Sequence, residues 1–174
     1  MGAVRPFLRF MRRNIRLLAH GAIIAALYVA LTHGQNMLLP GSASMAIQFR
    51  LSEALCVLAF FTPAAIPGLA VGCLLFNVTS GVALPLDFLV GSLASLLAAW
   101  GMWRCRRCPL PAMLFPALTN GLLVGWELAI YIGGGFWINA VYVAIGEATV
   151  LLTAGVLLYF SLKRNNLSRR LFQL

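Results

Sequence analysis

Long apolar stretches recur along almost the whole chain, interrupted by short groups of Pro, Gly and charged residues. These interruptions define six apolar segments, at residues 15–33, 47–62, 64–80, 86–103, 110–132 and 137–162. None of them alternates apolar and polar residues, as a half-buried strand or a barrel would. Crossing a membrane takes about 20 helical residues, and a helix satisfies its own backbone groups in lipid. The pattern therefore predicts an all-α integral membrane protein with a bundle of six transmembrane helices.

The second and third segments are short and are separated only by Thr62 and Pro63. We expect them to form a tight helical hairpin, with Pro67 near the start of the third helix. Composition agrees with a membrane location, because 61% of the 174 residues are hydrophobic and only 10% are charged.

The basic residues orient the predicted bundle. They form three clusters, before the first segment, after the fourth and after the sixth: Arg5, Arg9, Arg12, Arg13 and Arg16; Arg104, Arg106 and Arg107; Lys163, Arg164, Arg169 and Arg170. With six spans, all three clusters lie on one side, which the positive-inside rule assigns to the cytoplasm. The loops expected outside, 34–46, 81–85 and 133–136, contain no Lys or Arg.

The formal net charge of +9 comes from these clusters. Positive charge beside lipid headgroups indicates orientation and contact with anionic lipid, not binding of nucleic acid. We expect three parts: a basic interfacial segment at 1–14, the transmembrane domain at 15–162, and a basic cytoplasmic tail at 163–174. Both termini are then cytoplasmic.

Catalytic and metal-binding motifs are weak in this sequence. Cys105 and Cys108 form one CRRC pair, but no His stands close to it, so the pair is a poor metal signal. No Gly-rich loop with a Lys is present for an internal ATPase. We expect no catalytic residue, no metal and no cofactor.

The four acidic residues are the most informative polar positions: Glu53, Asp87, Glu127 and Glu147. The six-span topology places all of them between the membrane midplane and the outer surface. A carboxylate near a helix centre costs about 2.5–3.5 kcal/mol, so such residues face the bundle interior. One interpretation is internal pairing, since Arg50 and Glu53 have i, i+3 spacing. Arg50 is, however, the one cation outside the three clusters, and it cannot neutralise four acids.

The other interpretation is a polar cavity, open to the outside, for a small cationic or donor-rich ligand. Asn120, Glu127 and Tyr131 fall on one helical face of the fifth segment. Asn77 lies near the outer end of the third segment, and Trp137 stands at a similar level. An aromatic residue at that depth also suits an interfacial belt.

Small residues form a stripe on the first segment. Ala22, Ala26 and Ala30 repeat every four residues, a spacing that lets two helices approach closely in lipid. Two interpretations remain open for this stripe, packing within the bundle and docking against a different protein. Gly68 and Gly72 have the same spacing, and for them we expect packing within the bundle.

Five strings carry a family resemblance: QFRLSEAL, PAAIPGLAVGCLLFN, LDFLVGSLASLLAA, TNGLLVG and VAIGEA. Through them the chain resembles, over about residues 19–162, the QueT family of substrate-binding S components of energy-coupling factor (ECF) transporters. The resemblance implies a six-helix S-component fold in a prokaryotic plasma membrane and capture of a queuosine precursor from outside. It also implies a partner module, with a transmembrane scaffold, EcfT, and two cytoplasmic ATPases. Ala22, Ala26 and Ala30 would then dock the scaffold.

A 7-deazaguanine ligand matches the acids, because its N–H donors can meet a carboxylate in a bidentate manner. The predicted substrate-binding residues are Glu147, Glu127, Asn120, Asn77, Asp87, Glu53, Arg50, Tyr131 and Trp137. We expect Glu147 or Glu127 at the guanine edge. Asp87 or Glu53 would meet the ammonium of a 7-aminomethyl group, and Arg50 would orient Glu53 or contact a carbonyl oxygen.

The acid count favours the 7-aminomethyl form, with queuine and the 7-cyano form left open. The main alternative is a stand-alone, proton-coupled secondary transporter of a small cationic or nucleobase-like solute, which would have to dimerise at this length. An intramembrane enzyme would need a nucleophile and base pair that the sequence does not offer. A purely structural membrane subunit would need its acids for assembly and not for ligand binding.

Overall fold

The computed structural model describes residues 4–40, 42, 49–81 and 83–164, and all their regular structure is helical. In chain order the elements are α1 (Val4–Leu38), η1 (Leu51–Phe60), α2 (Ala65–Thr79), α3 (Asp87–Arg104), α4 (Pro109–Ala112), α5 (Phe115–Tyr131), α6 (Phe136–Val150), η2 (Leu151–Gly155) and α7 (Val156–Arg164). The last three follow one another without a break. The prediction of an all-α chain is confirmed for the described residues.

Three helical segments are long and apolar enough to cross a membrane, Asn14–Leu38, Pro109–Tyr131 and Phe136–Arg164. The other expected spans coincide with shorter or less apolar helices, since η1 has 10 residues, α2 has 15 and α3 has 18. The count of six spans and the cytoplasmic position of both termini therefore stay predictions.

η1 is the central element of the bundle, and it is a 3₁₀-helix. Eight of its 10 residues are buried, and it packs against α1, α2, α3, α6, η2 and α7. A 3₁₀-helix rises about 2.0 Å per residue, so η1 covers roughly 20 Å with ten residues, further than an α-helix of that length. Most of η1 is buried against other helices, which is the setting in which non-α backbone is tolerated at membrane depth.

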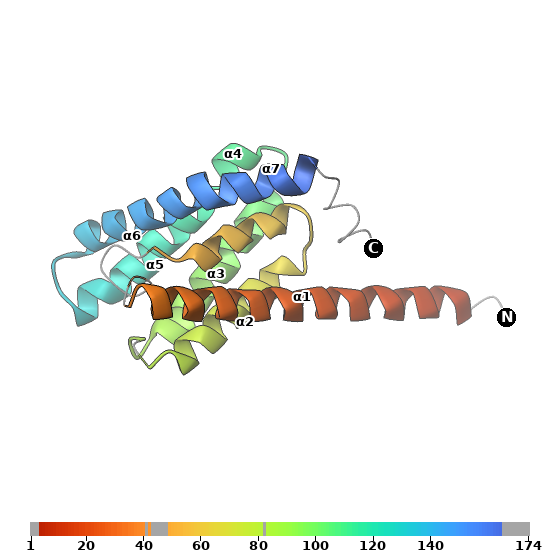
Figure 1. Cartoon of the computed structure of the whole chain (residues 1–174), viewed down its shortest axis with the longest axis horizontal. Helices are drawn as coiled ribbons and strands as arrows, with labels where there is room; N and C mark the ends of the chain where they lie inside the picture. The colour runs from red at the N-terminus through yellow and green to blue at the C-terminus, as the bar shows by residue number, and fades with distance from the viewer. Residues whose placement is uncertain (1–3, 41, 43–48, 82, 165–174) are drawn as a thin grey trace.

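The long helices pack in the order α1, α2, α3, α5 and α6, each against the next (Figure 1). The α1–α2 contact depends on small residues. A Cβ on Gly68 would lie 2.7 Å from the carbonyl oxygen of Gly21, and a Cβ on Gly72 would lie 2.7 Å from the Cβ of Tyr28. These contacts confirm that Gly68 and Gly72 pack within the bundle.

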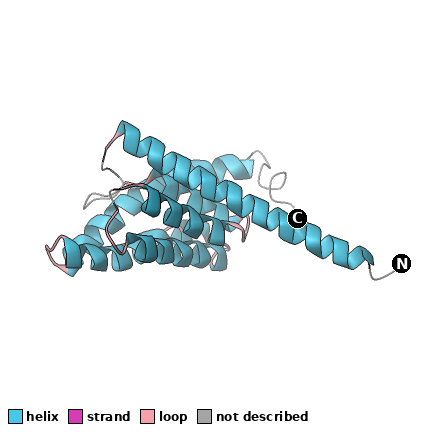
Figure 2. Ribbon diagram, turned by 90° about the horizontal axis from the view of Figure 1, so that it is seen from below, coloured by secondary structure: helices cyan, strands magenta, loops and turns pink. Residues whose placement is uncertain are grey.

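α1 begins at the same end of the bundle at which α7 ends (Figure 1), as an even number of crossings requires. The N-terminal part of α1 extends beyond the other helices (Figure 2), and the expected boundary at residue 14 falls inside this continuous helix. Residues 1–3 and most of the expected tail, 165–174, lie outside the described residues.

The turn between α5 and α6 is made by three consecutive glycines. Gly133, Gly134 and Gly135 have φ of 85°, 81° and 85°, a region that residues with a side chain seldom adopt. The Asn139 side chain donates to the carbonyl oxygen of Gly133 over 2.7 Å. This tight reversal sets α5 and α6 side by side, where a Cβ on Gly125 would lie 2.6 Å from the Cα of Ala140.

Candidate substrate-binding site

Seven of the nine predicted site residues are buried polar groups, each at most 5% exposed. They are Arg50, Glu53, Asn77, Asp87, Asn120, Glu127 and Glu147. Five segments supply them: the N-terminal end of η1, and helices α2, α3, α5 and α6. Residues up to 97 positions apart in the sequence, from Arg50 to Glu147, thus meet inside the bundle.

Arg50 is the cation that the four acids share. Asp87 and Glu53 act on its guanidinium electrostatically, and Arg50 in turn acts on Glu127 and on Glu147. Four carboxylates around one guanidinium give the cluster an excess of negative charge whenever the acids are ionised.

Glu53 is held by donors of the protein itself. The hydroxyl of Tyr28 donates to Oε1 over 2.6 Å, and that of Ser95 reaches the same oxygen over 3.5 Å. The thiol of Cys56 donates to Oε2 over 3.1 Å. Because these donors come from α1, α3 and η1, Glu53 ties three elements together.

Asp87 is also engaged within the protein. It is the first residue of α3, where a negative charge suits the helix dipole, and its Oδ2 accepts the backbone N–H of Leu84 over 2.7 Å. The side-chain amide of Asn77 donates to the backbone oxygen of Asp87 over 2.7 Å. Asp87 therefore fixes the junction between α2 and α3.

Glu127, Glu147 and the two asparagines keep polar atoms without a partner. Within the described part of the chain, no group makes a hydrogen bond of normal geometry to either oxygen of Glu127, Oε2 of Glu147, Oδ1 of Asn77 or Nδ2 of Asn120. The Asp87 carboxyl and the Leu86 backbone do lie close to Glu127, and the Asn120 amide lies close to Glu147. An unsatisfied buried polar group costs about 1–3 kcal/mol, and such groups are uncommon in native proteins. Four of these five atoms are acceptors, so the cluster has the chemistry to bind a donor-rich or cationic molecule.

Glu127 is buried and has a second acid, Asp87, as a neighbour. Asp87 acts on it electrostatically, opposed by the more weakly acting Arg50. A cation placed beside Glu127 and Asp87 would offset the charge of an ionised carboxylate there and would supply donors to the unpaired oxygens.

The two aromatic residues predicted for the site lie elsewhere. Tyr131 is 43% exposed and Trp137 is 72% exposed, at the last turn of α5 and the first turn of α6. The ring of Trp137 contacts Phe136, with centroids 4.8 Å apart. Their exposure matches an interfacial belt, and the structure does not bring them together with the acids.

A protein-family model described as QueT transporter matches residues 18–164, which is most of the chain. The chain belongs to the QueT transporter family. No curated protein and no solved structure matches it. Family membership gives this QueT-family protein a role in transport, and its long apolar helices make it a membrane protein.

Sequence reasoning missed several polar residues that support the site of this QueT-family protein. Tyr28, Thr32 and Gln35 are buried on the inward face of α1, and Ser95 is buried on α3. A signal for the first three was present, because positions 28, 32 and 35 form a polar stripe with helical spacing in an otherwise apolar segment.

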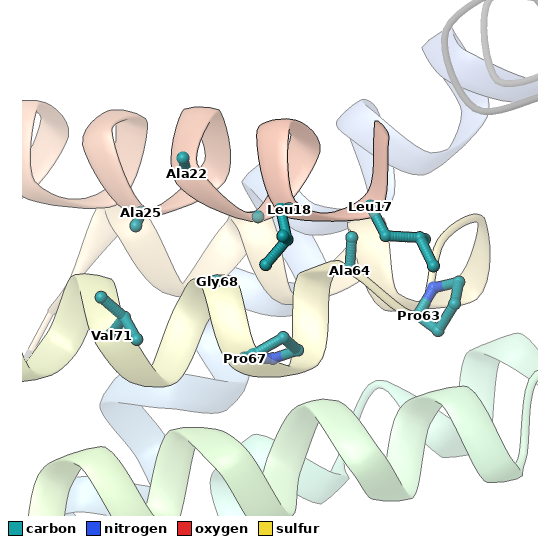
Figure 3. Close-up of a pocket in the computed structure, with 10 residues that line it drawn as sticks. Leu17, Leu18, Ala22, Ala25, Pro63, Ala64, Pro67, Gly68 and Val71 are labelled. Carbon is teal, nitrogen blue, oxygen red and sulfur yellow. The ribbon is translucent and has the colours of Figure 1, made fainter. Parts of the chain in front are cut away.

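An apolar groove of about 310 Å³ lies between α1 and α2, along residues 17–25 of α1 (Figure 3). Its lining is Leu17, Leu18, Gly21, Ala22, Ala25, Pro63, Ala64, Pro67, Gly68 and Val71, and none of the predicted substrate-binding residues is among them. Ala22 forms part of the groove, and Ala22, Ala26 and Ala30 are exposed. The described helices of this QueT-family protein thus leave the alanine stripe uncovered.

Proposed function

We propose that this QueT-family protein is the substrate-binding S component of an ECF-type importer that captures a queuosine precursor from outside for ATP-driven uptake. The observation that carries the proposal is the buried set of unpaired polar atoms on Glu127, Glu147, Asn77 and Asn120. Membership of the QueT transporter family supports transport as the process that this set serves.

The hydrogen-bonding pattern supports a division of labour among the acids. Glu147, on which Asn120 also acts, meets the N–H donors of the pyrimidine edge of a 7-deazaguanine in a bidentate manner. Glu127, beside Asp87, meets the ammonium of a 7-aminomethyl group. Glu53 is left as a structural acid, because three protein donors already occupy it.

The same proposal assigns a partner to the outer face of α1. Ala22, Ala26 and Ala30, with the groove beside Ala22, would receive the transmembrane scaffold EcfT, which carries the two ATPases. Exposure of all three alanines supports this docking, because small residues let a partner helix approach closely in lipid. The complex would work in a prokaryotic plasma membrane, with both termini of this chain in the cytoplasm.

The test replaces the two open acids by amides in the purified protein, Glu127→Gln and Glu147→Gln. A hydrogen bond to a charged group contributes about 1.5–3 kcal/mol, so each change should weaken binding of 7-aminomethyl-7-deazaguanine about 10- to 100-fold in calorimetry. Thr149→Val, on the exposed face of α6, is the control and should bind like the wild type. Unchanged affinity in the double variant would contradict the assignment.

A second measurement separates the proposal from the proton-coupled alternative. In cells that contain the whole importer, uptake should stop when the ATPases are inactivated. Uptake that persists without the ATPases, and collapses with the proton gradient, would favour a secondary transporter that uses the unpaired carboxylates of Glu127 and Glu147 as proton carriers.

A further inference from the structure

Three buried polar side chains of α1 face three consecutive residues at the start of η1. Tyr28, Thr32 and Gln35 lie on one face of α1, and they are 0%, 0% and 6% exposed. Their partners are the side chains of Glu53 and Ser52 and the backbone N–H of Leu51. The residue numbers rise along α1 while those of the partners fall from Glu53 to Leu51. The two segments are therefore antiparallel, and the contacts form three rungs of a ladder.

The rungs are short hydrogen bonds. Tyr28 donates to Glu53 over 2.6 Å. The hydroxyls of Thr32 and Ser52 lie 2.7 Å apart, and Thr32 also donates to the Tyr28 carbonyl oxygen over 2.7 Å. The N–H of Leu51 donates to Oε1 of Gln35 over 2.8 Å. We name these three contacts the α1–η1 zipper.

Gln35 adds a contact on the other side of Arg50. Its amide Nε2 donates to the backbone oxygen of Phe49 and, over 2.8 Å, to the hydroxyl of Ser42. The backbone on both sides of Arg50, at Phe49 and Leu51, is therefore held by one side chain of α1. The first N–H groups of a helix lack partners within the helix, so Gln35 also caps η1.

The geometry of η1 makes these contacts necessary. A 3₁₀-helix has poorer hydrogen-bond geometry than an α-helix, and runs longer than about four residues are uncommon. The start of η1 thus depends on outside contacts to keep its conformation, and α1 supplies them. Glu53 and Arg50, which belong to the candidate substrate site, sit at this end of η1.

We propose that Tyr28, Thr32 and Gln35 are positioning residues of the substrate site. They hold Glu53 and Arg50 in position. Because the positive charge of Arg50 acts on Glu127 and Glu147, its position affects how strongly these two acids bind the ligand. They act through η1 and not by touching the ligand. This inference rests on the proposed function, because it assumes that the cluster binds a queuosine precursor.

The test uses variants that remove one hydroxyl and keep the shape of the side chain. Tyr28→Phe and Thr32→Val each break one rung, and Thr32→Ser keeps the hydroxyl. Tyr142→Phe on the exposed face of α6 and Thr153→Val are matched controls, the latter because Thr153 is exposed and makes the same type of hydrogen bond to its own helix. Calorimetry with 7-aminomethyl-7-deazaguanine gives the affinity and the binding-competent fraction separately.

Tyr28→Phe and Thr32→Val should bind about tenfold more weakly, while Thr32→Ser and both controls stay within about twofold of the wild type. A merely structural role would lower the competent fraction and the thermal midpoint without changing the affinity, and that result would overturn the inference. If Tyr28→Phe does not yield folded protein, Ser52→Ala breaks the second rung from the η1 side and carries the same expectation.

The outcomes for the wild type separate the two proposals. Wild-type protein that binds the compound, together with zipper variants of unchanged affinity, would overturn the positioning role alone. Wild-type protein that binds none of the 7-deazaguanine compounds would overturn the proposed function, and the positioning role with it.

Discussion

Glu53 and Glu127 are the same type of residue and are equally buried, yet their oxygens have different surroundings. Glu53 accepts from Tyr28, Cys56 and Ser95, whereas no described group makes a hydrogen bond of normal geometry to Glu127. The difference assigns them different work. Glu53 joins helices, and under the proposed function Glu127 keeps its hydrogen-bonding capacity for the ligand.

A substitution at Gly91 tests whether Asn77 belongs to the binding site. A Cβ at this position would lie 3.0 Å from Nδ2 of Asn77 and 3.4 Å from Sγ of Cys73, so Gly91→Ala should displace Asn77 from the site. We expect ligand affinity to fall about fivefold or more. Gly34→Ala, where a new Cβ would meet nothing within 4 Å, is the control and should bind normally. Equal affinities of the two variants in calorimetry would contradict the position of Asn77 in the binding site.

Most polar members of the candidate site could be predicted from the sequence, because polar residues are conspicuous in apolar segments. The nine predicted residues include all seven that the structure brings together. Which of the acids are internally bonded could not be predicted, because Tyr28 and Ser95 approach Glu53 from positions 25 and 42 residues away. The helical spacing of Tyr28, Thr32 and Gln35 could have predicted a polar face on α1. Their partners in η1 could not be predicted from the sequence.

At the scale of the helix, the sequence located each helical segment but not its local geometry. Hydrophobic runs and Pro or Gly interruptions indicate which part of the chain is helical, although α1 (Val4–Leu38) extends beyond both ends of the predicted segment 15–33. They do not distinguish a 3₁₀-helix such as η1 from an α-helix, because the choice depends on packing against other elements. The π-helical turn η2 lies against η1, where a Cβ on Gly155 would be 3.3 Å from the side chain of Val57. The 3₁₀-helix η1 and the π-helical turn η2 therefore pack against each other.

The two faces of α1 give a prediction at this scale. The inward face carries the zipper, and the outward face carries the exposed Ala22, Ala26 and Ala30. Ala26→Trp should therefore abolish copurification with the EcfT scaffold, because the ring would keep the partner helix at a distance. Ligand binding by the isolated chain should stay within about twofold. Loss of binding together with retained copurification would contradict the separation of the two faces.

The control for Ala26→Trp is a Trp on an exposed surface outside the proposed docking face. Leu152→Trp suits this purpose, since Leu152 is 51% exposed on η2. It should leave both copurification and ligand binding unchanged.

At the scale of the whole molecule, the distribution of Arg and Lys predicts orientation. The turn with Cys105 and Cys108 should face the cytoplasm, and the segment 81–85 should face outward. In intact cells, a membrane-impermeant thiol reagent should label Ala83→Cys and leave Cys105 and Cys108 unlabelled until the cells are opened. Cys56 and Cys73 are 0% exposed and give little background. Labelling of Cys105 and Cys108 in intact cells would contradict this orientation and would show that the turn faces outward.

At this scale the central proposal is that the chain alone forms a site for a queuosine precursor. The direct measurement is calorimetry of the purified, detergent-solubilised protein with 7-aminomethyl-7-deazaguanine, 7-cyano-7-deazaguanine, queuine and guanine, without scaffold or ATPases. The account predicts saturable binding of one of the first three, strongest for the aminomethyl form, and much weaker binding of guanine. No binding of any of the four, by a protein that remains folded and monodisperse, would contradict it.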